Sequence, residues 1–154
     1  EVVFLLAGPI DEGNPAFIPE AQIRAWEAEG TIRYLGFRED LRGLLALSTL
    51  LVLPSYREGV PQVLLEGAAM GKPLVATNVP GCCEVVRHGV NGFLVPPRDP
   101  EALAKAIIRL LDDPDLRAKM SQASRSLAEQ EFSAHRQVAQ VIQVYRLLLE
   151  KAEH

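Results

Sequence analysis

The chain is poor in the residues that would place it outside the ordinary globular classes. Its 154 residues include two cysteines, the adjacent Cys82 and Cys83, and only 6% aromatic residues. A relaxed disulfide needs Cα atoms about 5.5 Å apart, so we expect two reduced thiols. They have no nearby histidine pair that would complete a zinc site, and we expect no metal. Acidic residues outnumber basic ones by 20 to 16, which argues against nucleic acid as a partner.

Long hydrophobic runs are also absent. The longest nearly continuous apolar run, residues 44–53, is shorter than the about 20 residues that a membrane-spanning helix needs. The first residues lack the basic leader of a signal peptide, and the chain opens inside an apolar run without an initiator methionine. We therefore expect a cytoplasmic protein, and we interpret residue 1 as an internal position of a longer polypeptide.

What is present is an alternation of short apolar runs with helical patterns. Strands are expected at 2–7, 31–35, 50–53, 73–77 and 91–95. Helices or helical turns are expected at 20–29, 41–47, 62–70 and 81–87. The alternation predicts an α/β fold, a Rossmann-like parallel sheet with helices on both faces. Such sheets bind ligands at the carboxyl ends of their strands. The loops to examine are 8–15, 36–40, 54–61, 78–83 and 96–99.

The last third of the chain changes to helix alone. Asp99 and Asp113 each precede a proline and an acidic residue, which is typical of a helix start. A third helix is expected after Ser133. Its buried stripe would be Val138, Ile142, Tyr145 and Leu149. We expect a single domain over 1–154, with an α/β core at 1–97 and a helical tail at 98–154.

One loop combines several features of a ligand site. It contains Glu58 beside Gly59 and enters a helix that carries Glu66. A glycine lets a ligand approach the backbone, and free amides at a helix start favour a negatively charged group. Glu66 could accept hydrogen bonds from two ribose hydroxyls, and Glu58 from hydroxyls of a sugar. Because residues 67–71 are small and apolar, we expect Glu66 as a lone carboxylate on a buried helix, which needs a partner.

Plainer alternatives stay open for the charged residues. Glu58 and Glu66 could be ordinary solvated side chains. Arg57 and Lys72 could each reach a phosphate or form a surface salt bridge. His88, just before a glycine, is expected as a surface cap rather than a catalytic base.

Four segments, in order along the chain, carry a resemblance to a known family. They are Gly36-Phe37-Arg38-Glu39-Asp40, Pro54-Ser55-Tyr56-Arg57-Glu58-Gly59-Val60-Pro61, Leu65-Glu66-Gly67-Ala68-Ala69-Met70-Gly71-Lys72-Pro73 and Asn91-Gly92-Phe93-Leu94-Val95-Pro96. The set resembles the C-terminal half of family 4 of the retaining glycosyltransferases, which has the GT-B fold of two Rossmann-like domains. Glu58 and Glu66 match the family's Glu-x7-Glu signature, and the resemblance covers nearly the whole chain.

The resemblance implies a donor site for a nucleotide-sugar. Glu66 would hold the ribose hydroxyls, and Glu58 would contact the donor sugar as the catalytic candidate. The neighbours lining the sugar and phosphate pocket would be Gly59, Val60 and Pro61. The residues approaching the base would be Gly36, Phe37 and Arg38. The reaction would keep the anomeric configuration and need no metal and no cofactor, because the nucleotide-sugar is itself a substrate.

Two further segments narrow the implied substrates. Residues 79–86 and 8–11 resemble the corresponding segments of bacterial family members. Those enzymes build exopolysaccharide, O-antigen or lipid-linked oligosaccharide, often from UDP-sugars. The resemblance thus implies a hexosyltransferase of surface polysaccharide biosynthesis, with a saccharide or lipid-linked saccharide as acceptor. Peripheral association of the full enzyme with the inner face of the membrane stays open, as do the donor sugar, its base, the acceptor and the linkage.

The chain departs from the family in two respects. Members often have an arginine where this chain has Cys83. The family's first strand and helix, which carry an arginine and a lysine for the diphosphate, have no counterpart before Val2, and neither does the acceptor-binding N-terminal domain. We therefore expect the fragment to be inactive alone. Its sheet should show a gap, a rearranged pairing or a strand supplied by a partner, which leaves self-association open.

Two other functions compete with glycosyl transfer. One is a non-catalytic domain for assembly or sugar-nucleotide sensing, and the other is a different GT-B enzyme such as a UDP-sugar epimerase. A dinucleotide dehydrogenase is disfavoured, because no G-x-G-x-x-G opens a helix.

Overall fold

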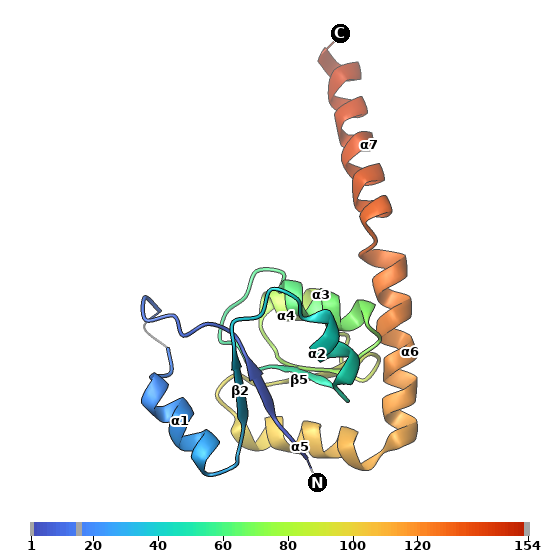
Figure 1. Cartoon of the computed structure of the whole chain (residues 1–154). Coiled ribbons are helices and arrows are strands. Elements are labelled where there is room, and N and C mark those ends of the chain that lie inside the picture. The colour runs from blue at the N-terminus through green and yellow to red at the C-terminus, as the bar shows by residue number, and fades with distance from the viewer. Residues whose placement is uncertain (1, 15–16, 153–154) are drawn as a thin grey trace. The chain divides into compact units, whose positions relative to one another are not determined.

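The computed structural model describes residues 2–14 and 17–152, with side chains as far as residue 149. The chain divides into two compact units, Glu1–Leu41 and Arg42–His154. Each unit is described by itself below, and Figure 1 shows the elements of both.

The first unit is a strand–helix–strand motif. Strand β1 (Leu5–Ala7) pairs in parallel with β2 (Arg33–Gly36), and helix α1 (Glu20–Ala28) lies between them in sequence. The Tyr34 hydroxyl donates to the carbonyl of Gly8 at 2.9 Å, which ties the end of β1 to β2. The strand is shorter than the predicted 2–7. Its expected first half is exposed, because no described layer of this unit covers it.

The second unit contains a three-stranded parallel sheet in the order β3-β4-β5. Its strands are β3 (Leu51–Leu53), β4 (Leu74–Thr77) and β5 (Gly92–Val95). Helix α2 (Arg42–Leu47) precedes the sheet, and α3 (Gln62–Ala69) and α4 (Pro80–Val85) connect its strands. All of these lie within a few residues of the predicted boundaries.

Alternate residues of this sheet pack into two separate hydrophobic clusters, one on each face. Leu74 and Ala76 of β4 join the cluster built with α3 and α4. Val75, between them, joins the other cluster, built with α5 (Pro100–Asp112) and with Met120 of α6 (Pro114–Glu131). Figure 1 shows α3 and α5 on opposite sides of β5. The predicted parallel sheet with helices on both faces is therefore confirmed.

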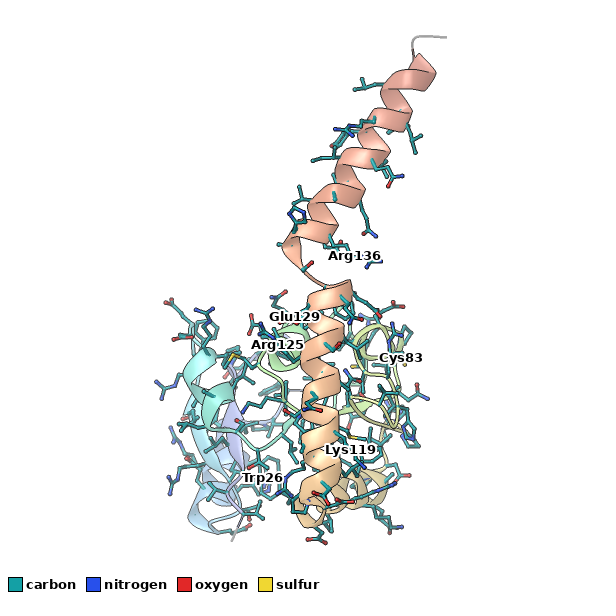
Figure 2. The ribbon with its side chains drawn as sticks, turned by 90° about the vertical axis from the view of Figure 1, so that its right-hand side faces the viewer. Trp26, Cys83, Lys119, Arg125, Glu129 and Arg136 are labelled. Carbon is teal, nitrogen blue, oxygen red and sulfur yellow. The ribbon has the colours of Figure 1, made fainter. Side chains whose placement is uncertain are left out.

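Side-chain hydrogen bonds to backbone carbonyls attach α6 to the turn after α3. Ser121 Oγ donates to the Gly71 carbonyl at 2.6 Å, and Arg125 Nη1 to the Ala69 carbonyl at 2.5 Å. Arg125 and its ion-pair partner Glu129 lie one turn apart on α6 (Figure 2). Deeper in the fold, the buried Ser124 hydroxyl lies 2.7 Å from the Lys72 carbonyl. Side chains of α6 thus donate hydrogen bonds to the backbone carbonyls at which the chain turns from α3 into β4.

Helix α7 (Ala134–Ala152) forms as predicted, but its expected burial is wrong. The predicted stripe is exposed, with Val138 at 58%, Ile142 at 45%, Tyr145 at 64% and Leu149 at 65%. The periodic pattern specifies one apolar side of the helix. It does not specify a surface to cover that side, and none of the described residues does so.

The strands form two sheets, β1-β2 and β3-β4-β5, rather than one. The gap, rearranged pairing or partner-supplied strand expected for the sheet stays a prediction. The single domain expected over 1–154 stays a prediction. Within 2–14 and 17–152, no helix has the length and apolar character that crossing a membrane requires.

Candidate ligand-binding site

The loop that joins β3 to α3 lies at the carboxyl end of the sheet, as predicted. It begins at Pro54, directly after β3, and ends at Pro61, the N-cap residue of α3. Proline offers no side-chain acceptor, so no side chain caps the first amides of α3. Those N–H groups carry the positive end of the helix dipole. The start of α3 is thus suited to a negatively charged group.

Glu58 is fixed within this loop by a chain of hydroxyl groups. Its half-buried carboxylate accepts a hydrogen bond from Ser55 Oγ at 2.6 Å. The carbonyl of Ser55 in turn accepts one from the hydroxyl of Thr77, the last residue of β4. The position of Glu58 therefore depends on the end of the neighbouring strand. A single lone pair is used by Ser55, so the carboxylate keeps acceptors for a ligand.

The start of α4 packs directly on the backbone of the same loop. A Cβ atom at Gly81 would lie 1.2 Å from the Gly59 carbonyl oxygen and 2.7 Å from that of Glu58. A Cβ at Gly59, in contrast, would meet nothing within 4 Å. The loop is thus held from the side of α4 and open at Gly59. Val60 beside it is exposed and Pro61 is buried.

Cys82 shows how closely α4 approaches Glu58. The residue is fully buried, and this burial raises the pKa of its thiol, with a further increase from the negative charge of Glu58. Cys83 is exposed and its Sγ donates to Asn78 Oδ1 at 3.0 Å; Figure 2 labels it at the surface. Both cysteines are free, as expected. No group of three His, Cys, Asp or Glu that could hold a metal occurs in the described part of the chain.

Glu66 lies on α3, one turn after its start, and is half-buried rather than buried. Gln62 Nε2 donates to its Oε1 at 3.4 Å, a long hydrogen bond. The next residue, Gly67, packs against Leu51 of β3, where an added Cβ would lie 2.5 Å from a methyl carbon. Glu66 therefore points about 100° around the helix from the sheet-facing side. The expectation of a lone carboxylate on a buried helix was too strong, and a ligand role does not follow from burial.

The three residues predicted to approach the base belong to the other compact unit. Gly36 ends β2 with φ of 67°, and its carbonyl accepts from the Gly8 amide at 3.0 Å. Phe37 is 66% exposed and Arg38 is exposed as well. Their membership in one site with Glu58 and Glu66 stays a prediction.

Two alternative candidates have structural roles. Lys72 Nζ donates to the carbonyls of Ala46 at 3.1 Å and Ser48 at 2.9 Å, at the end of α2. These hydrogen bonds favour a structural role for Lys72 over the phosphate contact and the surface salt bridge considered from the sequence. His88 Nδ1 accepts from the Leu94 amide at 3.1 Å, which favours a structural role over that of a base.

Sequence reasoning missed a cavity of about 470 Å³ at the carboxyl ends of β3, β4 and β5. Its lining includes Pro54, Tyr56, Thr77, Val95, Arg98 and Leu103. Loops 54–61 and 96–99 were both expected to border a site, but the pairing of Tyr56 with Arg98 depends on the fold. The guanidinium of Arg98 lies over the Tyr56 ring, 5.2 Å from its centroid.

Comparison with known proteins places this geometry in a family. Residues 1–113 match the family model described as Glycosyl transferases group 1. An N-acetyl-alpha-D-glucosaminyl L-malate synthase of Bacillus anthracis is 34% identical over 117 residues, which are 76% of this chain and 31% of that protein. An N,N'-diacetylbacillosaminyl-diphospho-undecaprenol alpha-1,3-N-acetylgalactosaminyltransferase of Campylobacter jejuni is 33% identical over 119 residues, 77% of this chain and 30% of that protein.

Solved structures agree with this match. The crystal structure of Anabaena HepE in complex with UDP has a TM-score of 0.81 and 31% identity, over 93% of this chain and 41% of that chain. A glycosyltransferase from Rickettsia africae has a TM-score of 0.84 and 26% identity, over 96% of this chain and 40% of that chain. The chain spans 30% to 31% of the two curated relatives named above.

Proposed function

The chain belongs to the Glycosyl transferases group 1 family, and from this we propose that it is the donor-binding part of a retaining glycosyltransferase. The donor is a nucleotide-sugar, with UDP as the nucleotide. The acceptor is a saccharide or a lipid-linked saccharide of a bacterial surface polysaccharide. In this proposal the full-length protein is a cytoplasmic hexosyltransferase, and the fragment alone is inactive.

The β3–α3 loop is the observation that carries the proposal. It presents a positioned carboxylate, Glu58, an open backbone at Gly59 and a helix start without a side-chain cap. The amides at the start of α3 can stabilise the negative charge that develops on a departing diphosphate. Glu58 can accept hydrogen bonds from sugar hydroxyls while Ser55 holds it in place. Glu66, half-buried one turn further along, is available to the ribose.

The relatives support the choice of donor and acceptor. The Anabaena structures are described as complexes with UDP and with UDP-glucose. The Campylobacter enzyme is named for a sugar carried on diphospho-undecaprenol. The first substrates to test are therefore a UDP-sugar as donor and a lipid-linked saccharide as acceptor.

The ribose role of Glu66 is tested by calorimetry of the full-length protein with UDP. Glu66→Gln removes one charge and one pair of acceptor lone pairs. We expect UDP affinity to fall about tenfold or more, because hydrogen bonds to a charged acceptor contribute about 1.5–3 kcal/mol. Glu129→Gln is the control, since Glu129 is an exposed carboxylate on α6 paired with Arg125. Unchanged UDP affinity in Glu66→Gln would remove Glu66 from the site.

Glycosyl transfer is separated from the competing functions by product analysis. The full-length protein should convert a UDP-sugar and an acceptor to UDP and a longer saccharide with retained configuration. An epimerase would change the UDP-sugar without an acceptor, and a non-catalytic domain would bind UDP without turnover. Either result would contradict the proposed activity.

A further inference from the structure

The cavity between the ends of β3, β4 and β5 has the size of a small-molecule site. Its volume of about 470 Å³ falls within the common range for ligand pockets. Pro54, Thr77 and Val95 lie where the three strands end, so the cavity opens at the carboxyl edge of the sheet. Neither Glu58 nor Glu66 lines it. The donor site proposed above therefore leaves this cavity unused.

Arg98 supplies a positive charge to the cavity without a carboxylate partner. No ion pair involves Arg98 in the described part of the chain. The adjacent Asp99 also lines the cavity, but its Oδ1 accepts from the Ala102 amide at 2.9 Å and caps α5. Arg98 has φ of 61°, the only residue other than glycine with positive φ in the described chain. A guanidinium without a carboxylate is suited to bind an oxyanion through two parallel N–H groups.

The remaining walls of the cavity are mostly apolar. Tyr56 contributes its ring, on which Arg98 stacks, and Pro54 and Leu103 contribute aliphatic surface. Aromatic and aliphatic walls with a few convergent polar groups are typical of small-molecule sites. The expected ligand therefore carries an oxyanion next to an apolar or ring-shaped body.

The cavity and the proposed donor site share one loop. Tyr56 lies two residues before Glu58, and Ser55 between Pro54 and Tyr56 donates to the Glu58 carboxylate. A molecule bound on Tyr56 therefore contacts the same loop that holds Glu58. An acceptor needs this position, whereas the nucleotide end of the donor is assigned to Glu66.

We propose that this cavity binds the anionic group of the acceptor, with Arg98 as the oxyanion-binding residue and Tyr56 as the surface for the adjoining part of the molecule. The oxyanion is the carboxylate of an acidic sugar or the phosphate of a carrier lipid. The inference rests on the proposed function and adds to it an acceptor contact from this domain.

The test is calorimetry on the full-length protein saturated with UDP, so that the donor site is occupied. The probes are glucuronic acid for the carboxylate and geranyl diphosphate for the lipid phosphate. Glucose and geraniol are the neutral counterparts. We expect one anionic probe to bind and its neutral counterpart to bind at least about tenfold more weakly. The probe that binds identifies the source of the oxyanion.

The variant Arg98→Gly removes the guanidinium and suits the positive φ, so the fold is expected to be retained. It should weaken the anionic probe about tenfold and leave UDP affinity unchanged. Arg109→Gln is the matched control, because Arg109 is also exposed and also stacks on an aromatic ring, that of Phe93 at 5.0 Å. It should change neither affinity.

Several results would overturn the inference while leaving the donor site intact. They are UDP binding with no binding of either anionic probe, equal binding of anionic and neutral probes, and equal probe affinity in Arg98→Gly and the unaltered protein. Absence of UDP binding in the unaltered protein would instead contradict the proposed function itself.

Discussion

At the scale of single residues, the position of the candidate site depends on which atoms are absent. Gly81 has no side chain, and this lets the start of α4 touch the backbone of Glu58 and Gly59. The sequence identified Glu58 and Gly59, because a glutamate beside a glycine in a loop at a strand end is a recognisable pattern. It did not identify Gly81, because the need for a glycine there arises from an approach of two segments distant in the chain.

Gly81→Ala is expected to destabilise the protein and displace the loop that carries Glu58. A Cβ 1.2 Å from a carbonyl oxygen cannot be accommodated without backbone movement. Overpacking of this kind costs about 1–3 kcal/mol or more. Urea unfolding measures the loss of stability. UDP calorimetry measures the loss of affinity that a displaced loop would cause.

Gly59→Ala is the matched control for the same contact. Its added methyl meets nothing within 4 Å, so the free energy of unfolding should change by less than about 0.5 kcal/mol. Equal stability of Gly81→Ala and Gly59→Ala would contradict the close packing of α4 on this loop.

Cys82 predicts a loss of stability at alkaline pH. Burial and the charge of Glu58 raise the pKa of its thiol in the folded state. Below the ordinary thiol pKa of about 8.5, both states keep the proton and the contribution is fully present. As pH rises from there toward the higher native pKa, the unfolded state loses its proton first, so unfolding becomes more favourable.

Denaturant unfolding between pH 7 and 10 measures the free energy of unfolding across this range. We expect it to decline from about pH 8.5 upward. Cys82→Ala should lose less stability over this interval than the unaltered protein, whereas Cys83→Ala should decline as the unaltered protein does, because Cys83 is exposed. Equal alkaline declines in both variants would exclude Cys82 as the cause.

At the scale of helices and strands, local sequence patterns predicted an element correctly where the contacts that bury and bound it lie within the same unit. β4 and β5 begin one residue after the predicted starts. Their apolar residues are buried as predicted, because they alternate between two clusters of the same unit. The starts of α5 and α6 were predicted from Asp99 and Asp113, since capping is a contact within four residues. β1 and α7 were wrong in length or burial, because both depend on a covering surface that a local pattern cannot supply.

Asp113→Ala tests the capping contribution at the start of α6. Asp113 Oδ1 accepts from the Leu116 amide at 2.9 Å, and the substitution removes this capping bond from the first turn of α6. We expect a loss of about 1 kcal/mol in the free energy of unfolding. Asp113→Ser keeps an acceptor at the cap and should retain most of the stability. If urea unfolding finds the two variants equally destabilised, the loss has a cause other than the capping bond.

At the scale of the whole molecule, the predictions for the sheets and for the last helix both depend on a partner segment. The described strands form two sheets, β1-β2 and β3-β4-β5, and α7 exposes its apolar side chains. A family resemblance supplied the strand order from which a gap in the sheet is expected, and that gap stays a prediction. No comparable information was available for α7, and hydrophobic periodicity alone predicted burial that the structure does not contain.

Helix α7 is expected to contribute little to the stability of the second unit and much to self-association. Every buried hydrophobic residue in the described chain lies before α7. Removal of residues 134–154 should therefore change the free energy of unfolding by less than about 1 kcal/mol, because no core contact is lost. The exposed apolar side chains of α7 are Val138, Val141, Ile142, Val144, Tyr145, Leu147, Leu148 and Leu149. A patch of this kind favours association in water.

Sedimentation of the 154-residue chain should therefore show concentration-dependent association that the shortened chain lacks. The double variant Tyr145→Lys and Leu149→Lys is the control for chain length, since it places charge on the apolar side and keeps all 154 residues. It should behave as the shortened chain does in sedimentation and as the unaltered chain does in urea unfolding. A stability loss of several kcal/mol on removal of residues 134–154 would show instead that α7 covers the core, because only the exposure of buried apolar surface produces a loss of about that size.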